Sequence, residues 1–266
     1  MSVAQKPLAV VTGGSSGIGF ALAEQFAQNG FDLLIAAEPN GLSDAAQKLQ
    51  SSGASVQAVA VDLATSDGVD TLYQAVQATG RPVATAAINA GVGIGGDFVR
   101  QTDLDEELNL INLNVVSTVH LAKHLLRDMV ARDEGRVLFT ASIASIQPSP
   151  FEAVYGASKA FILSFAESLR NELKDSGVSI TALMPGPTET NFFHRADMDD
   201  TKVGQSQKDD PSDVARQGFE ALMAGKERIV AGSLKTKAMG VMSDILPDSI
   251  KAEMHRKLSE PGSANS

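Results

Sequence analysis

Residues 8–19 read LAVVTGGSSGIG, and this stretch decides the fold. The apolar run over 8–11 predicts a short buried strand, and the apolar spacing that follows Gly19 predicts a helix ending near Asn29-Gly30. In a strand, glycine loop and helix arranged in this order, the backbone can approach a pyrophosphate closely, and the helix N-terminus can hold it. The stretch therefore predicts nucleotide binding, although glycines can also form a purely structural turn.

The spacing of the glycines narrows the class of nucleotide site. Gly13, Gly17 and Gly19 follow a Gly-x-x-x-Gly-x-Gly pattern, which differs from the commoner Gly-x-Gly-x-x-Gly loop and from a Walker A loop. Because no Gly-Lys-Ser/Thr follows the loop, an NTPase is not expected.

Length, charge and composition exclude several other classes. A chain of 266 residues without cysteine suits one large α/β domain, cannot form disulfides or thiolate metal sites, and fits a reducing cytoplasm. The net charge of -10, without a basic cluster, argues against nucleic-acid binding. Residues 1–7 contain no apolar signal segment, and no later run reaches the roughly 18 apolar residues of a membrane span. We therefore expect a cytoplasmic protein with no membrane partner and no metal site.

Strand and helix patterns alternate along the chain. The predicted strands cover residues 8–11, 32–37, 56–61, 83–88, 136–140, 179–184 and 228–231. The main predicted helices between and after them include 66–78, 104–132, 153–175 and 211–224. Such alternation predicts parallel βαβ units with right-handed crossovers, and hence a doubly wound Rossmann sheet of seven mostly parallel strands with helices on both faces.

The expected domain is single and spans residues 1–258. Its last part, residues 233–258, is predicted to be helical in two pieces around Pro247, and the polar residues 259–266 are predicted to form a flexible tail. In an open α/β sheet the ligand crevice lies outside the carboxyl ends of the strands. Gly13, Asp62, Asn89 and Ser142 are therefore expected to meet at one edge.

Tyr155 and Lys159 are the candidate acid–base pair. In a helix that begins near Ala153 they lie four residues apart on one face, where the lysine charge favours the phenolate and lowers the tyrosine pKa from about 10. Ser142, at the end of the preceding predicted strand, can lie beside the same reacting oxygen. Taken alone, such a pair is far more often a surface tyrosine in contact with a lysine.

A polar segment over about 188–210 follows the strand predicted at 179–184. It is long, charged and poor in apolar periodicity, yet Phe192 and Phe193 are adjacent within it. The segment is either a mobile flap that closes over a substrate or a surface loop whose phenylalanines pack onto the domain. His194 and Arg195 supply basic groups there, so a carboxylated substrate stays possible.

With these residues placed, the chain resembles the short-chain dehydrogenase/reductase family as far as about Ala231. No single motif is specific, but together they follow the family's order and spacing. The matching residues are Thr12-Gly13-x-x-x-Gly17-x-Gly19, Asp62-Leu63, Asn89-Ala90-Gly91, Asn112, Ser142, Tyr155-x-x-x-Lys159 and Pro185-Gly186. The chain departs from the family where Ile88 precedes Asn89 and where Ala141 precedes Ser142.

The resemblance implies roles for individual residues. Tyr155 would be the general acid in carbonyl reduction and the general base in alcohol oxidation, with Ser142 hydrogen-bonded to the same oxygen. Lys159 would lower the tyrosine pKa and hold the nicotinamide ribose. Asn112 would keep a water that links Lys159 to solvent; Asn114 is its rival, and Asn112 fits the family's Asn-Leu pattern better.

The resemblance also implies the binding residues. The expected cofactor residues are Thr12, Gly13, Ser15, Ser16, Gly17, Ile18, Gly19, Glu38, Asp62, Leu63, Asn89, Ala90, Gly91, Tyr155, Lys159, Pro185, Gly186, Thr188 and Thr190. The expected substrate residues are Ile94, Ile143, Gln147, Phe151, Phe192 and Phe193. Because the substrate set is mostly apolar, we expect a small, mostly apolar ketone or secondary alcohol.

Glu38 bears on the choice of cofactor. It follows the strand predicted at 32–37, where a carboxylate can accept hydrogen bonds from the adenosine ribose of NAD and repels a 2′-phosphate. The sequence therefore favours NAD(H), with NADP(H) as the alternative, because Glu38 lies one position beyond the usual aspartate and could instead point to solvent.

The leading hypothesis is thus a nicotinamide-dependent oxidoreductase. One alternative is a non-catalytic dinucleotide-binding regulator, which the complete set of candidate catalytic residues disfavours. A second is an epimerase or dehydratase, whose chains are generally longer and carry a larger substrate domain. The helices predicted over 104–132 and 153–175 resemble those that pair between subunits in the family, so a homotetramer or homodimer is expected.

Overall fold

Seven parallel strands form the centre of the computed structural model, which describes residues 5–265. The strands are β1 (Leu8–Thr12), β2 (Asp32–Ala37), β3 (Val56–Ala60), β4 (Val83–Ile88), β5 (Gly135–Thr140), β6 (Val178–Pro185) and β7 (Arg228–Ala231). Their order across the sheet is β3-β2-β1-β4-β5-β6-β7, with every neighbouring pair parallel. The predicted doubly wound fold is confirmed, and each strand lies within about one residue of its predicted bounds.

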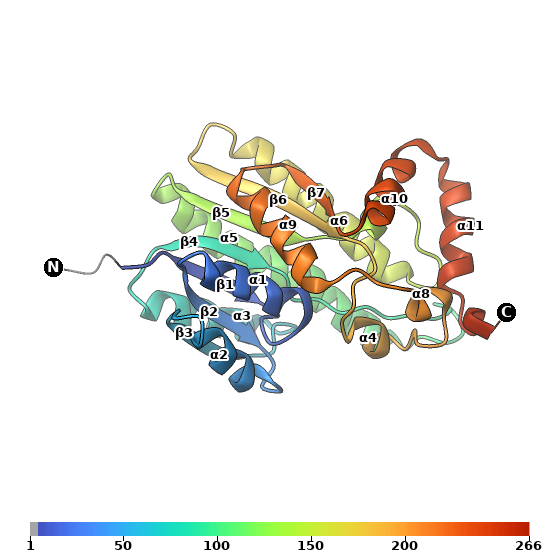
Figure 1. Cartoon of the computed structure of the whole chain (residues 1–266), viewed down its shortest axis with the longest axis horizontal. Helices are drawn as coiled ribbons and strands as arrows, with labels where there is room; N and C mark the ends of the chain where they lie inside the picture. Colours follow the sequence, from blue (N-terminus) through green and yellow to red (C-terminus); the bar gives the residue numbers. More distant parts are fainter. Residues whose placement is uncertain (1–4, 266) are drawn as a thin grey trace.

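Helices cover both faces of this sheet (Figure 1). One face carries α1 (Gly17–Gln28), α2 (Leu42–Gln50) and α9 (Pro211–Met223), and the other carries α3 (Ser66–Ala78), α5 (Ser117–Ala131) and α6 (Ala153–Glu172). Successive strand residues point to opposite faces. Ala9 and Val11 accordingly lie in the core with α1, whereas Leu8 and Val10 lie in the core with α3 and α5.

The strand order reverses between β1 and β4. Because the chain runs outward from this point in both directions, the loops after β1 and β4 separate and leave a crevice at the carboxyl ends of the strands. The glycine loop follows β1, and Asn89-Ala90-Gly91 follows β4. The fold thus brings together the motif residues that the sequence places far apart.

The helix predicted over 104–132 is divided into three parts. It begins with α4 (Leu104–Ile111), passes through the π-helical turn η1 (Asn112–Val116) and continues as α5. The side chain of Asp103 caps its start by accepting from the N–H groups of Asp105 and Glu106. A π-helical turn bonds over five residues and therefore rotates the following side chains relative to a regular helix.

The C-terminal part is helical in two pieces, as predicted, with α10 (Leu234–Ile245) and α11 (Asp248–Ser259) on either side of Pro247. Both helices lie beyond the carboxyl ends of the strands (Figure 1). Within the described residues, no helix has the length and apolar character needed to cross a membrane.

The residues after α11 differ from the flexible tail predicted over 259–266. They form the short 3-10 turn η3 (Ser263–Asn265), which contacts the segment predicted as a flap. The Gly262 N–H donates to Asp200 Oδ2 at 2.7 Å, and the Lys202 N–H donates to Ser263 Oγ at 3.0 Å. Because these partners lie about 60 residues away, local composition could not reveal them; Ser266 lies outside the described residues.

Candidate active site

A cavity of about 660 Å³ opens at the carboxyl ends of the strands. This volume is within the usual range for a small-molecule site. It is lined by all the predicted cofactor residues except Thr12, namely Gly13, Ser15, Ser16, Gly17, Ile18, Gly19, Glu38, Asp62, Leu63, Asn89, Ala90, Gly91, Tyr155, Lys159, Pro185, Gly186, Thr188 and Thr190. Thr12 lies behind the wall and supports it.

The glycine loop has the shape that a pyrophosphate needs. Gly13 and Gly17 have φ values of 68° and 56°, which favour glycine, and a Cβ on Gly19 would lie 2.2 Å from the Gly13 carbonyl oxygen. Among the described residues no side chain caps the N-terminus of α1, so its first N–H groups face the cavity edge without a local partner. Together with the helix dipole, these groups suit an anion. The residues present therefore fit a dinucleotide.

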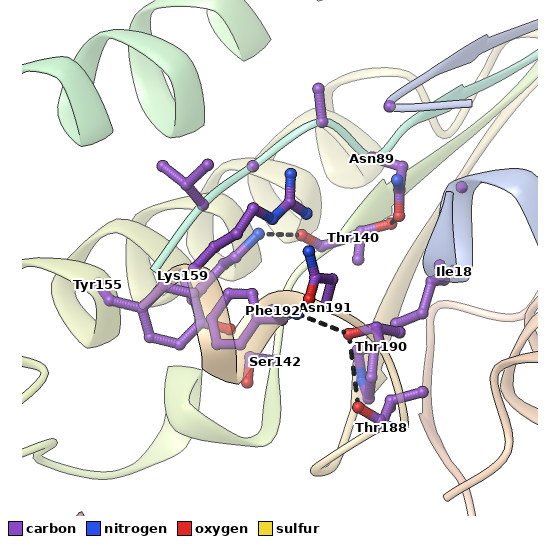
Figure 2. Close-up of a pocket in the computed structure, with 18 of the residues that line it drawn as sticks. Ile18, Asn89, Thr140, Ser142, Tyr155, Lys159, Thr188, Thr190, Asn191 and Phe192 are labelled. Carbon is purple, nitrogen blue, oxygen red and sulfur yellow. Dashed lines mark hydrogen bonds between the residues drawn. The ribbon is translucent and has the colours of Figure 1, made fainter. Parts of the chain in front are cut away.

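A chain of hydrogen bonds connects the glycine loop to the candidate catalytic lysine. Thr12 Oγ1 accepts from the N–H groups of Asn89 and Ala90 at 2.9 and 3.0 Å, and Asn89 Nδ2 donates to the Thr12 carbonyl at 3.2 Å. Asn89 Oδ1 in turn accepts from Thr140 Oγ1 at 3.0 Å. Lys159 Nζ completes the chain by donating to the Thr140 carbonyl at 2.9 Å. Figure 2 shows Asn89, Thr140 and Lys159 together at the cavity.

Tyr155, Ser142 and Lys159 are brought together as predicted (Figure 2). Ser142 ends the segment after β5 and caps η2 (Ile143–Ile146), where its Oγ accepts from the Ala144 N–H at 3.1 Å. The Ser142 side chain also lies near enough to Tyr155 to act on the pKa of its hydroxyl. Lys159 is buried, with its Nζ 5.9 Å from the centre of the Tyr155 ring. A carbonyl oxygen held beside Tyr155 could therefore meet two hydroxyl groups.

The electrostatics of this trio differ from the sequence expectation. Burial raises the pKa of Tyr155, the Ser142 hydrogen bond opposes that rise, and the charge of Glu152 adds to it. The pKa of Tyr155 is therefore raised, not lowered as its spacing from Lys159 predicted, and Lys159 is not among the groups that shift it. Burial also lowers the pKa of Lys159 from 10.5 to about 8, so the lysine charge is itself disfavoured where it lies.

Asn114, not Asn112, lies in the catalytic region, which corrects the preference for Asn112. Neither asparagine lines the cavity, but the Asn112 side chain is exposed to solvent. Asn114 is 1% exposed, and its side chain donates to the Val92 carbonyl and to Ser158 Oγ, both at 3.0 Å, and accepts from the Val92 N–H at 3.0 Å. A Cβ on Gly91 would lie 3.0 Å from Asn114 Oδ1 and 3.3 Å from Lys159 Nζ. The π-helical turn sets this orientation, and residue spacing alone does not reveal such a turn.

The segment over 188–210 is folded onto the site. It contains the short helices α7 (Phe192–Arg195) and α8 (Lys202–Gln205) and a small apolar cluster of Phe193, Ala196 and Met198. The Gly95 N–H donates to the Ala196 carbonyl at 2.8 Å, which joins the segment to the loop after β4. The sequence left open a flap that closes over a substrate and a loop packed onto the domain. Phe193 packs as in the second interpretation, whereas Phe192 covers the cavity.

Phe192 closes over the reacting groups. Its ring lies 5.2 Å from the Tyr155 ring, and a Cβ on Gly93 would lie 2.3 Å from its Cζ. The Phe192 N–H donates to Thr190 Oγ1 at 3.2 Å, so the ring is tied to a residue that lines the cofactor side of the cavity (Figure 2).

Four of the six predicted substrate residues line the cavity: Ile143, Gln147, Phe192 and Phe193. Ile94 and Phe151 do not, which corrects their assignment. Phe151 has a φ of 65°, and its ring lies 4.9 Å from the guanidinium carbon of Arg256 on α11. The left-handed backbone and this cation–π contact turn the ring toward the C-terminal helix.

His255 and Ser259 of α11 form a buried polar cluster with Glu152, which the sequence analysis did not predict. Glu152 Oε2 accepts from Ser259 Oγ at 3.0 Å and lies 2.9 Å from His255 Nε2, while His255 Nδ1 lies 3.2 Å from Gln147 Nε2. All four residues line the cavity. No family motif contains Glu152, His255 or Ser259. Glu152 lies three residues before Tyr155, and this closeness in the sequence could have indicated that Glu152 belongs to the site.

The chain is similar to known proteins over most of its length. The family model described as short chain dehydrogenase matches residues 7–201. The sulfoacetaldehyde reductase of Chromohalobacter salexigens is 33% identical over 183 residues, which are 68% of this chain and 72% of that protein.

Solved structures are similar over nearly the whole chain. A short-chain dehydrogenase/reductase from Burkholderia phymatum in complex with NAD has a TM-score of 0.82 and 25% identity, covering 98% of this chain and 99% of that one. A short-chain dehydrogenase from Sphingobium yanoikuyae in complex with NADPH has a TM-score of 0.78 and 28% identity, covering 90% and 96%.

The lowered pKa of Lys159 predicts a specific pH dependence of stability. Between pH 8 and 10.5 the unfolded chain binds more protons at this residue than the folded chain does, so the free energy of unfolding rises with pH there. The slope from one such group is at most about 1.4 kcal/mol per pH unit. We expect urea unfolding to show this rise in the wild type and to show it reduced in Lys159→Met.

The matched control is Lys123→Met, because Lys123 is exposed on α5. It should keep the wild-type slope. If the difference in unfolding free energy between the wild type and Lys159→Met stays constant across this pH range, Lys159 does not have a lowered pKa.

Proposed function

The chain belongs to the short-chain dehydrogenase family and is an oxidoreductase that uses a nicotinamide cofactor. From this premise we propose that it interconverts a small, mostly apolar ketone and its secondary alcohol, with Tyr155 as the general acid and base. The observation that carries the proposal is the convergence of Tyr155, Ser142 and Lys159 on the cavity that the glycine loop also lines.

The cofactor, when bound, supplies or accepts the hydride. In the reductive direction Tyr155 gives its hydroxyl proton to the carbonyl oxygen, and Ser142 hydrogen-bonds the same oxygen as charge develops on it. Burial favours the protonated phenol, which is the form that donates. Lys159 would hold the nicotinamide ribose, and Asn114 fixes the Gly91-Val92 turn beside the lysine.

The side chains that line the cavity near Tyr155 support an apolar substrate. Ile143, Phe192 and Phe193 line it near Tyr155, and the buried charge of Glu152 is already in contact with His255 and Ser259. Phe192 covers the reacting groups, and such a cover would exclude water from them.

The first test is a panel of aldehydes and ketones with NADH and NADPH, followed at 340 nm, for the wild type and for Tyr155→Phe. We expect turnover to fall about 10²- to 10⁴-fold in the variant, because the proton donor is lost, while cofactor affinity measured by fluorescence titration is largely kept. The chain has two tyrosines, so Tyr73→Phe, outside the cavity lining, is the matched control and should retain activity.

Equal turnover in Tyr155→Phe would refute its role. A best substrate that carries phosphate or several anionic groups would refute the apolar substrate class. Cofactor binding without turnover on any alcohol or carbonyl would favour the regulator alternative.

We propose NAD(H) as the preferred cofactor. Glu38 lines the cavity directly after β2, beside Asn40 and Gly41. Among the described residues that line this end, from 37 to 41 and from 61 to 64, none has a basic side chain. A 2′-phosphate would therefore meet a carboxylate without a compensating cation, whereas ribose hydroxyls could donate to it.

The prediction is a higher kcat/KM with NADH than with NADPH. Replacing Glu38 with Ser should narrow the difference, because it removes both the acceptor and the repulsion. Asp44→Ser, on α2 and outside the cavity lining, is the control and should leave the ratio unchanged. A wild-type preference for NADPH of about tenfold or more, some 1.4 kcal/mol, would contradict the assignment.

We also propose that the chain forms a homodimer or homotetramer through α4, α5 and α6. Large apolar side chains are exposed along these helices, namely Leu104, Leu108, Ile111, Val116, Val119 and Phe161. Ile111 and Phe161 line a shallow hollow between the helices that is almost wholly apolar. Exposed apolar surface of this kind marks an interface.

The expected cytoplasmic location stays a prediction.

Sedimentation velocity at micromolar concentration measures the assembly directly. We expect a dimer or tetramer for the wild type and dissociation in Phe161→Glu, because a charge would be buried in the interface. A wild type that sediments only as a monomer would contradict this proposal.

A further inference from the structure

A second group of ionisable side chains lies away from the cavity, between α3 and α5. These helices pack side by side on one face of the sheet (Figure 1). Asp70 extends from α3, and His120 and His124 extend from α5. None of the three lines the cavity described above. They are half-buried rather than fully exposed, with 48%, 27% and 29% of their side chains accessible.

The spacing of the two histidines is suited to chelation. Residues four apart lie on one face of a helix, and two histidines at this spacing can bind one metal ion. Asp70 then supplies a ligand from a separate helix. The three ligand atoms lie within 4.8 Å of one another.

The individual distances agree with a metal coordination sphere. His120 Nε2 lies 3.1 Å and His124 Nε2 lies 3.6 Å from the same oxygen, Asp70 Oδ1. Ligands about 2.0–2.1 Å from a tetrahedral zinc ion are separated by ~3.3 Å, which is between these two values. A metal could therefore enter with small side-chain movements.

Neighbouring groups hold His124 in place. The Tyr73 ring stacks on the His124 ring, with 4.3 Å between the ring centres and 17° between the planes. Tyr73 in turn donates its hydroxyl proton to Asp128 Oδ2 at 2.9 Å, which joins α3 to α5 a second time. Groups outside the ligand set that orient the ligands raise metal affinity.

We propose that Asp70, His120 and His124 form a binding site for Zn²⁺. Two imidazoles and one carboxylate suit a borderline divalent ion, whereas Mg²⁺ and Ca²⁺ prefer sites made entirely of oxygen. The three protein ligands leave the remaining coordination position to water. Each imidazole coordinates through a neutral nitrogen, so zinc binding displaces any proton held there.

The site joins two helices that lead to opposite parts of the active site. α3 follows the Asp62 turn at the cofactor side, and α5 follows the π-helical turn that carries Asn114. A metal bound to the folded chain and not to the unfolded one raises stability by mass action. We therefore expect bound zinc to hold α3 and α5 together and to raise the free energy of unfolding. Sequence patterning predicted no metal site because Asp70 and the two histidines are far apart in the chain.

The test is calorimetric titration of the chelator-treated wild-type protein with zinc chloride, together with thermal unfolding. We expect about one zinc ion per chain and a higher Tm with zinc. His120→Gln and His124→Gln should each weaken binding about 10- to 100-fold and abolish the Tm rise. Asp70→Asn, at a half-exposed position, gives an independent test if a histidine variant fails to fold.

His194→Gln is the matched control. His194 pairs with Asp199 at 2.6 Å but is not part of a three-ligand group among the described residues, so this variant should bind zinc as the wild type does. Absence of zinc binding at a hundred micromolar would overturn the proposal. So would zinc binding that persists unchanged in folded His120→Gln, His124→Gln and Asp70→Asn.

Discussion

The hydrogen bond from Lys159 Nζ to the Thr140 carbonyl is the interaction on which the candidate active site depends. Thr140 also donates its hydroxyl to Asn89, whose main chain donates to Thr12. These bonds cross the carboxyl ends of three neighbouring strands and end on the helix that carries Tyr155. Thr12, Thr140 and Lys159 are buried, Asn89 is partly buried, and all four are hydrogen-bonded. This network is therefore rigid and places the acid–base group at a fixed position relative to the glycine loop.

Two further sets of contacts complete the site around this series of hydrogen bonds. Asn114 binds the turn after β4 from behind, while Phe192 covers Tyr155 from the front. The C-terminal helix α11 brings His255 against Glu152, and the turn after it is hydrogen-bonded to residues Asp200 and Lys202 of the segment that carries Phe192. The C-terminal extension thus belongs to the substrate side of the site.

Much of this arrangement could be predicted because it depends on local signals. Apolar runs and turn residues place the strands, and the glycine loop and the Tyr155–Lys159 spacing place both ends of the cavity. The failures have a different origin. Asn112 was preferred because it fits the family's Asn-Leu pattern, and residue spacing cannot reveal the π-helical turn that buries Asn114 instead. Phe151 was assigned to the substrate pocket because the sequence does not show the left-handed backbone that turns its ring away. His255 and the residues after Ser259 were missed because their partners lie far away in the sequence. The sign of the Tyr155 pKa shift also differs from the prediction, since burial raises the pKa and Lys159 is not among the groups that shift it.

The central claim is that this site transfers a hydride and that Tyr155 handles the accompanying proton. The most direct measurement uses NADH or NADPH labelled with deuterium at the transferable position of the nicotinamide ring, with the carbonyl compound most active in the panel. Mass spectrometry of the product should find one deuterium on the alcohol carbon for each cofactor oxidised. An alcohol product without the label, or cofactor oxidation without any alcohol, would contradict the account.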